Sequence, residues 1–400
     1  MEGAEIAEEF VEHFHGNVYT GLIGGAVEVF IRSEGWNSVD GAPRSIPSSE
    51  SPLPNNIPKA MRTAVVPLMG VEMARAVQVE SSVWEKYLQS IRKMQENDPG
   101  TVGVFPYLLG DSTITNTKLG RILEPYQRIA TSPLQADGET DATLRCRDLT
   151  QGIFQILFQD GNTPLTVFIS HTNRGMPGTE EKVAELVEIV RQIILNTHLK
   201  EFFSVYDLQP GSYWATELQN RATTSALLAL RTDLYSSRDW CQKEMAISKR
   251  KGMPIVIIDA LSSNEERGSF LMDHMPRVPL RQQGGSWHKE DIFKALNLLV
   301  DECLKRALWN HQKQLSQSRP DFNISWWAPH APEPVTFAQW LVNEKESGNQ
   351  PRGNSIVRIV HPDPPLGLEE VSVLKQMLSI SCTGCTLDIV TPRSLATRDG

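Results

Sequence analysis

An aromatic residue and a carboxylate stand four residues apart in the middle of the chain, at Trp240 and Glu244. The pattern that starts at Asp239 is typical of a helix, and residues four apart lie side by side on one helical face. The short apolar run 225–230 before it predicts a buried strand. Ligands bind at the carboxyl edge of such strands in open α/β sheets. The pair could therefore offer a ligand both a stacking ring and a fixed negative charge.

The residues around this pair predict a strand that leads into a helix with well-marked ends. Asp239 can cap the helix, Gly252 can end it, and the last turn holds three cations, which the helix dipole favours there: Lys249, Arg250 and Lys251. Further strands are expected at 165–169, 202–206, 254–259 and 277–280. Helices are expected after Thr179 and over 292–304. Strands that alternate with helices predict an α/β fold whose parallel sheet is covered on both faces.

The flanking regions have a less regular α/β pattern. Before the central region we expect a helix through 83–91, loop-rich chain over 109–148, and strands near 26–31, 63–68 and 102–108. After it, the segment 318–334 is typical of a domain joint, and a strand, a helix and a strand are expected at 356–360, 368–378 and 386–390. These patterns predict an α/β region over 1–150, a central domain over 163–310, a linker over 311–355 and a partial α/β segment over 356–400.

The composition excludes several classes of protein. A net charge of −9 argues against a general nucleic-acid binder, because neutralising phosphates requires a basic surface. The first residues lack the basic and apolar parts of a signal peptide, and no apolar run approaches the ~18 residues of a membrane helix. Five cysteines, an odd and sparse set, fit a reducing compartment. We therefore expect a cytoplasmic protein that binds neither nucleic acid nor membranes.

Three motifs of the central region resemble Toll/interleukin-1 receptor (TIR) domains: VFISH at 167–171, DLQPGS at 207–212 and SSRDWCQKE at 236–244. They follow the family's order, after the first strand, after the second strand and at the helix after the third strand. The pattern formed by Trp240 and Glu244 is similar to that of the bacterial, nucleotide-consuming branch. The resemblance covers roughly residues 163–310 and implies a flavodoxin-like parallel sheet.

This resemblance implies that Glu244 is the catalytic residue of an NAD+ glycohydrolase or cyclase. Nicotinamide leaves as a neutral molecule while positive charge grows on the ribose, and a fixed carboxylate stabilises that charge. The implied substrate-binding residues are Trp240, Ser170, His171, Asp207 and Ser237. NAD+ is then the substrate, and no cofactor or metal is required. Tyr206 stands before the loop aspartate, where the family often has arginine, so a cation expected near the ligand is missing.

The resemblance also implies self-association through TIR domains and a role in bacterial antiphage defence or signalling. Two other classes remain open, a noncatalytic TIR scaffold and a nucleoside-processing transferase that uses a glutamate at a sheet edge. At the residue level, Glu244 could be a solvated helix carboxylate, Trp240 a core residue and His171 a satisfied loop residue. Release of nicotinamide from NAD+ would separate the first class from the other two.

Three weaker patterns lie outside the central region. The N-terminal region is weakly similar to a second TIR-like copy, but Leu88 stands four residues after Trp84, so such a copy would be noncatalytic. The end of the chain faintly resembles the start of nucleotide-sensing SLOG-type domains without their glycine-rich part, and we expect it to pack on the central domain or to continue in a domain cut short here. Cys382 and Cys385 have the spacing of half a zinc site, but no second pair is near, so structural thiols are expected.

Overall fold

The computed structural model describes residues 2–16, 18–19, 27–33, 43–47, 60–110, 112–129, 141–158, 165–172, 180–197, 199, 201–203, 225–265, 268–317 and 323–396. The chain divides into two compact units. Unit 1 comprises Met1–His15, Glu28–Gln135 and Glu139–Thr163, and unit 2 comprises Gly16–Val27, Ala136–Gly138 and Pro164–Gly400. None of the helices in the described ranges is long and apolar enough to cross a membrane.

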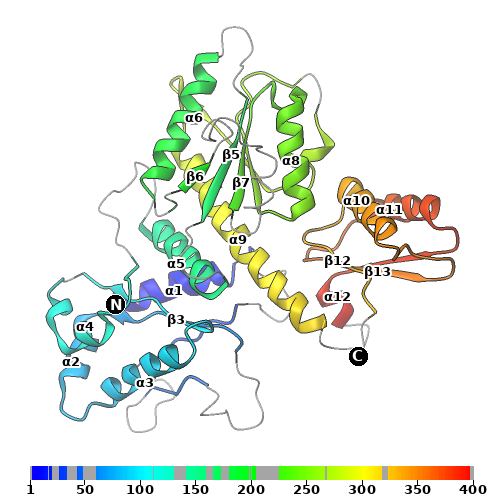
Figure 1. The fold of residues 1–400 in the computed structure, drawn as a ribbon. Coiled ribbons are helices and arrows are strands. Elements are labelled where there is room, and N and C mark those ends of the chain that lie inside the picture. The colour runs from blue at the N-terminus through cyan, green and yellow to red at the C-terminus, as the bar shows by residue number, and fades with distance from the viewer. Residues whose placement is uncertain are drawn as a thin grey trace, which may run out of the picture. The chain divides into compact units, whose positions relative to one another are not determined.

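Unit 2 contains a five-stranded parallel sheet in the order β6-β5-β7-β8-β9 (Figure 1). Its strands are β5 (Thr166–Ser170), β6 (Glu201–Phe203), β7 (Ser225–Arg231), β8 (Ile255–Asp259) and β9 (Arg277–Pro279). Numbered along this sheet, the order is 2-1-3-4-5, which is the flavodoxin-like order. The expected α/β fold with a parallel sheet is therefore confirmed.

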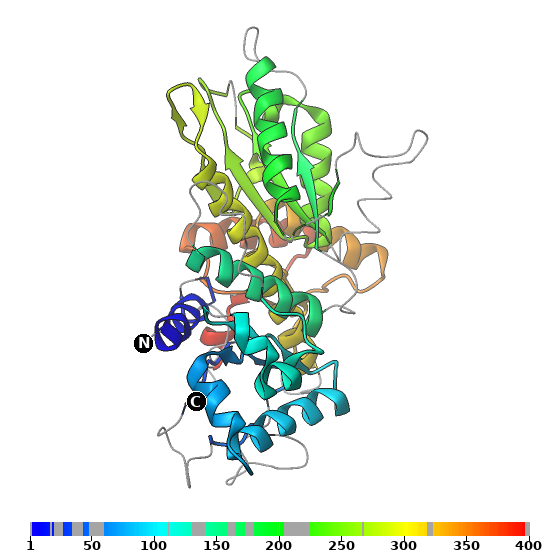
Figure 2. The same cartoon turned by 90° about the vertical axis from the view of Figure 1, so that its left-hand side faces the viewer.

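Helices cover both faces of this sheet, as its continuous apolar strands require. They are α6 (Glu180–Leu195), α8 (Asp239–Lys251) and α9 (Lys289–Gln317) (Figures 1 and 2). Cys241 and Met245 of α8 pack in one buried cluster with Leu227 and Ala229 of β7. The intervening strand residues point to the opposite face, and α9 contacts β7, β8 and β9.

A smaller parallel sheet follows in unit 2, in the order β12-β13-β14. Its elements are β12 (Trp326–Trp327), α10 (Pro334–Glu346), β13 (Ile356–Val360), α11 (Leu368–Ser381), β14 (Thr386–Val390) and α12 (Pro392–Ala396). The strand, helix and strand expected at the end of the chain are confirmed. The range 311–355 is not an extended linker, because it holds the end of α9, β12 and α10, and α10 places Phe337 and Trp340 in the core of this sheet.

Two details of unit 2 involve turns. Gly284 and Gly285 connect β10 (Gln282–Gln283) to β11 (Ser286–Trp287) with positive φ angles, as a tight hairpin requires. Cys382 and Cys385 form a disulfide, which corrects the expectation of free thiols. The reason is local, because α11 ends at Ser381 with Cys382 as its C-cap, and the turn through Gly384 brings the two Cα atoms to 5.6 Å.

Unit 1 is built from short elements. They are α1 (Glu2–Phe14), β1 (Thr63–Val65), β2 (Leu68–Met69), α2 (Val71–Gln78), α3 (Val83–Asn97), β3 (Val102–Val104), β4 (Tyr107–Leu108), η1 (Ser112–Asn116), α4 (Lys118–Leu123) and α5 (Asp141–Phe158). β1 pairs with β3 and β2 with β4, both in parallel. Each of the two expected strands here is split in two, because Pro67 and Pro106 lack the N–H that a continuous ladder needs.

Two expectations for unit 1 are wrong. The described residues 27–33, inside which a strand was expected, form no strand. The range 109–148 is not uniformly loop-rich, since it contains η1, α4 and the start of α5. The similarity of this region to a second TIR-like copy stays a prediction.

Candidate functional site

Helix α8 begins and ends close to the positions that the sequence predicts. Its C-terminal residue Lys251 is followed by Gly252 in the left-handed conformation, with φ of 65°, which is the expected end signal. Asp239 is not the cap, because the cap position falls on Arg238, whose side chain makes no capping hydrogen bond. Asp239 instead lies in the first turn, where its negative charge interacts favourably with the positive end of the helix dipole.

Glu244 lies on the buried side of α8, with only 2% of its surface exposed. The hydroxyl of Ser170, the last residue of β5, donates a hydrogen bond to its Oε2 at 2.5 Å. The same hydroxyl oxygen is 2.6 Å from the phenol oxygen of Tyr235, which belongs to η3 (Tyr235–Ser237). Because a serine has one proton to donate, Tyr235 donates to Ser170 and Ser170 donates to Glu244. The carboxylate is thus held at the carboxyl end of a central strand.

Burial controls the protonation of this cluster. It raises the pKa of Glu244 from 4.5 to about 7, against hydrogen bonds from the side chains of Ser170 and Trp240 that lower it. Burial also raises the pKa of Tyr235 well above its ordinary value and that of Cys241 to about 12, and in both cases the charge of Glu244 adds to the effect. The phenol and the thiol therefore keep their protons near neutral pH, whereas the carboxyl group of Glu244 titrates in that range.

Trp240 differs from a core tryptophan, because 38% of its surface is exposed although it hydrogen-bonds to the buried Glu244. The spacing of four residues places the two side chains together, as the sequence predicts. An indole that contacts a carboxylate and remains partly open to solvent can stack against a ring that enters beside the carboxylate.

The other predicted site residues are His171, Ser237 and Asp207, and each has a different outcome. His171 follows Ser170 and is half-buried, and its carbonyl accepts a hydrogen bond from the thiol of Cys241 at 3.6 Å. Ser237 is exposed and donates to the carbonyl of Leu234 at 2.9 Å, so it closes its own turn and does not join the cluster around Glu244. Asp207 lies outside the described residues.

Tyr235, Cys241 and a network that holds the loop before α8 also belong to the site, although the sequence does not predict them. Arg231, at the end of β7, donates to Asp259 at 2.9 Å and also pairs with Glu265. The hydroxyl of Ser236 donates to Glu265 at 2.6 Å, which fixes η3 over the sheet edge. The position of Tyr235 between a strand and a helix could have marked it as a candidate site residue. The sequence does not show, however, which side chain of that segment is buried against Glu244.

Comparison with known proteins assigns no family to this chain. No protein-family model and no curated protein matches it. Among solved structures, the sugar isomerase domain of an RpiR transcription factor from Sphaerobacter thermophilus is 14% identical, covers 39% of this chain and 79% of its own, and has a TM-score of 0.21. A likeness at this TM-score carries no argument about function.

Proposed function

We propose that this protein is an NAD+ glycohydrolase in which Glu244 acts on the nicotinamide–ribose bond. The observation that carries the proposal is a glutamate that is 2% exposed, lies at the carboxyl end of β5 and accepts hydrogen bonds from Ser170 and Trp240. A solvated helix carboxylate would have neither this burial nor these partners. Buried carboxylates with a shifted pKa are typical of functional sites.

The reaction needs one negative charge close to the ribose. The bond between ribose C1′ and the nicotinamide nitrogen breaks, and its electron pair stays on nicotinamide, which leaves neutral. The positive charge passes to the ribose, where the carboxylate of Glu244 stabilises it. Water then bonds to C1′ and releases a proton, so that NAD+ and water give nicotinamide, ADP-ribose and a proton. If an adenine nitrogen attacks in place of water, the product is cyclic ADP-ribose.

The neighbours of Glu244 have distinct roles in this proposal. Tyr235 and Ser170 form a chain of donors that favours the ionised carboxylate and fixes its orientation. Trp240 stacks on a ring of the dinucleotide. His171 contacts the ligand after the first strand, and the resemblance to TIR domains implies a contact from Asp207 as well. NAD+ carries a positive charge on its nicotinamide ring, so its binding favours the ionised form of Glu244 further.

The test is incubation of the purified protein with NAD+ and chromatographic measurement of nicotinamide, ADP-ribose and cyclic ADP-ribose. We expect nicotinamide release by the wild-type protein and by Glu185→Gln, a control that removes an exposed glutamate of α6. A protein that releases no nicotinamide at any concentration would contradict the proposal and favour the TIR scaffold. Turnover of nucleosides but not of NAD+ would favour the transferase.

We further propose that the protein works in the cytoplasm, in bacterial defence or signalling, and that it self-associates through the central domain. The resemblance of the motifs at 167–171, 207–212 and 236–244 to TIR domains is what supports this proposal.

A further inference from the structure

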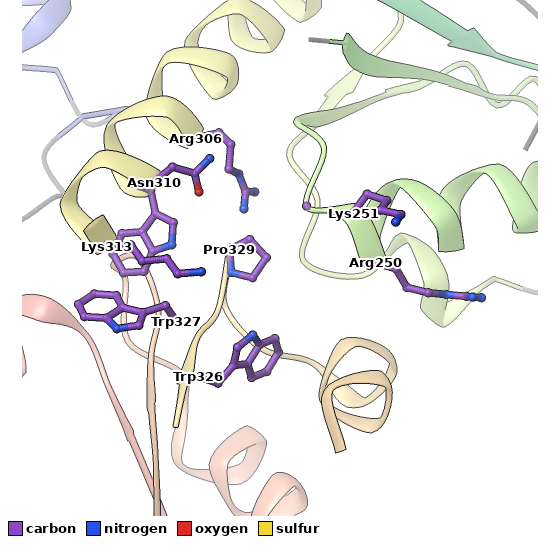
Figure 3. Close-up of a pocket in the computed structure, with 10 residues that line it drawn as sticks. Arg250, Lys251, Arg306, Asn310, Lys313, Trp326, Trp327 and Pro329 are labelled. Carbon is purple, nitrogen blue, oxygen red and sulfur yellow. The ribbon is translucent and has the colours of Figure 1, made fainter. Parts of the chain in front are cut away.

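A cavity of about 260 Å³ lies in unit 2 where the end of α8, the second half of α9 and the segment around β12 meet (Figure 3). Among the described residues, the side chains that line it include four cations and no carboxylate: Arg250, Lys251, Arg306 and Lys313. Such a concentration of one sign of charge is unusual for a protein whose net charge is −9. It attracts anions locally.

The α9 side of the cavity presents polar groups along one helical face. Arg306, Asn310 and Lys313 follow the spacing i, i+4 and i+7, and Figure 3 shows the side chains of Arg306 and Lys313 extending toward Pro329. Lys251 and Arg250 belong to the α8 side, and Figure 3 shows both of their side chains extending away from α9.

The guanidinium of Arg306 has an unsatisfied hydrogen-bond donor. Its Nη1 is buried and has no hydrogen-bond partner within the described part of the chain. Glu302 lies one turn earlier and attracts the guanidinium, but its carboxylate accepts a hydrogen bond from Lys305 at 2.7 Å. Burial lowers the pKa of Arg306 to about 10, so it stays charged at neutral pH. A buried charged donor without a partner costs free energy, and a bound anion would remove that cost.

The backbone at Gly252 packs tightly against the wall of the cavity. Gly252 has a φ of 65°, and a Cβ atom there would lie 3.1 Å from Pro329 and 3.5 Å from Nη1 of Arg306. A side chain at this position would therefore be strained, would press on Pro329 and would come into contact with the guanidinium. The glycine that ends α8 also leaves room for the charged group of α9.

Indole rings form the remaining wall. Trp326 is half-buried and one of its faces stacks on Trp340, with the planes 6° apart and the centroids at 5.5 Å. Trp309 is buried, and its Nε1 donor has no partner among the described residues. Indoles bind the flat faces of nucleic-acid bases, and their N–H groups donate to ring nitrogens or carbonyls.

We propose that this cavity is a binding site for a nucleoside phosphate. The phosphate lies against Arg306 and Lys313, and the base lies against Trp326. The volume is near the lower end of ligand pockets, about 300 Å³, so the cavity suits a mononucleotide better than a dinucleotide. Lys251 follows Glu244 on α8 by about 10 Å of helix, which separates this cavity from the proposed active site. The proposal does not depend on the NAD+ chemistry.

The test is calorimetric titration of the full chain with AMP and ADP, with adenosine and inorganic phosphate as partial ligands. We expect AMP or ADP to bind at least tenfold more tightly than either partial ligand, with an affinity that falls as salt rises. Lys313→Glu reverses one charge at a half-buried position and should weaken nucleotide binding at least tenfold. Lys345→Glu makes the same change on the exposed surface of α10, outside the cavity, and should leave binding unchanged.

Absence of binding at millimolar nucleotide would overturn the proposal, as would equal affinities for AMP and adenosine or equal effects of Lys313→Glu and Lys345→Glu. Arg306→Gln is a second variant, valid where circular dichroism shows that it folds, and it should also lose affinity. Glu244→Gln should retain nucleotide binding, so failure of this site and failure of the proposed active site are distinguishable. Loss of nucleotide binding in Glu244→Gln with retention in Lys313→Glu would assign the nucleotide to the Glu244 site and overturn the proposal.

Discussion

At the scale of single residues, the ionisation of Glu244 decides how the proposed reaction depends on pH. Burial raises its pKa to about 7, and only the ionised form can stabilise positive charge on the ribose. The ratio kcat/KM should therefore rise with pH through an acid limb near pH 7, which reports the free protein. The limb in kcat should lie lower, because bound NAD+ favours the carboxylate.

Replacing Ser170 with alanine tests this control of ionisation. Ser170→Ala removes a hydrogen bond to the charged form of Glu244, so the pKa should rise and the acid limb should move to higher pH. A hydrogen bond to a charged group contributes about 1.5–3 kcal/mol, which corresponds to a shift on the order of one pH unit or more. The measurement is the pH profile of nicotinamide release. Activity should be low at pH 6 and partly recovered at pH 9.

Ser237→Ala is the matched control for that experiment. Ser237 bonds only within its own turn, so its loss should leave the pH profile unchanged. Equal profiles for Ser170→Ala and the wild-type protein would show that the hydroxyl does not set the ionisation of Glu244.

The exposed indole of Trp240 leads to a different prediction. Trp240→Ala should raise KM several-fold and alter the ratio of linear to cyclic ADP-ribose, because a stacked ring can hold the adenine near the reacting ribose. The free energy of unfolding should fall less than for a core tryptophan, since 38% of the residue's surface is exposed. Product analysis of a variant with a normal thermal transition checks both points. An unchanged KM and product ratio would assign Trp240 a packing role.

At the scale of elements, a buried ion pair connects α8 to α10. Nζ of Lys249 lies 3.4 Å from Oε1 of Glu333, their side chains are 0% and 2% exposed, and Nζ also donates to the carbonyl of Asp273 at 3.0 Å. Glu333 in turn caps α10 by accepting from the backbone N–H groups of Val335 and Thr336. The helix that carries Glu244 is thereby held to the small sheet.

Breaking this pair should destabilise unit 2 strongly. Lys249→Met leaves Glu333 buried without its cation, which costs about 3–5 kcal/mol of unfolding free energy. Lys243→Met, an exposed change on the same helix, should cost less than about 0.5 kcal/mol. Urea unfolding compares the two variants. Similar midpoints for both would mean that the pair contributes little.

Much of the central fold follows from local patterns, and the exceptions have local causes. The strand and helix that hold Glu244 are predicted because a continuous apolar run, a helical pattern and a terminal glycine all agree. Helix α10 was missed because Pro334 suggested a joint, whereas proline is well suited to the first turn of a helix. Local patterns also do not reveal contacts between distant residues, such as Ser170 with Glu244 or Lys249 with Glu333.

At the scale of the whole molecule, the site around Glu244 has no cation for a pyrophosphate among the contacts that the described residues make with its carboxylate. A neighbouring copy of the chain could supply one. We therefore expect NAD+ turnover per molecule to rise with protein concentration as copies associate. The measurement is specific activity over a wide dilution series, with molecular size determined in parallel. Constant specific activity from a persistent monomer would contradict this expectation.

The most direct test of the central claim is the NAD+ turnover of Glu244→Gln under the conditions that give the wild-type protein its highest activity. The variant keeps the shape and removes the charge, so turnover should fall on the order of a thousandfold. It should not lose stability at pH 8. Because the folded pKa of Glu244 is raised above 4.5, the wild-type protein loses up to about 3 kcal/mol of stability as pH rises from about 4.5 to 7, and the variant lacks that loss. A folded Glu244→Gln protein that releases nicotinamide at the wild-type rate would contradict the account.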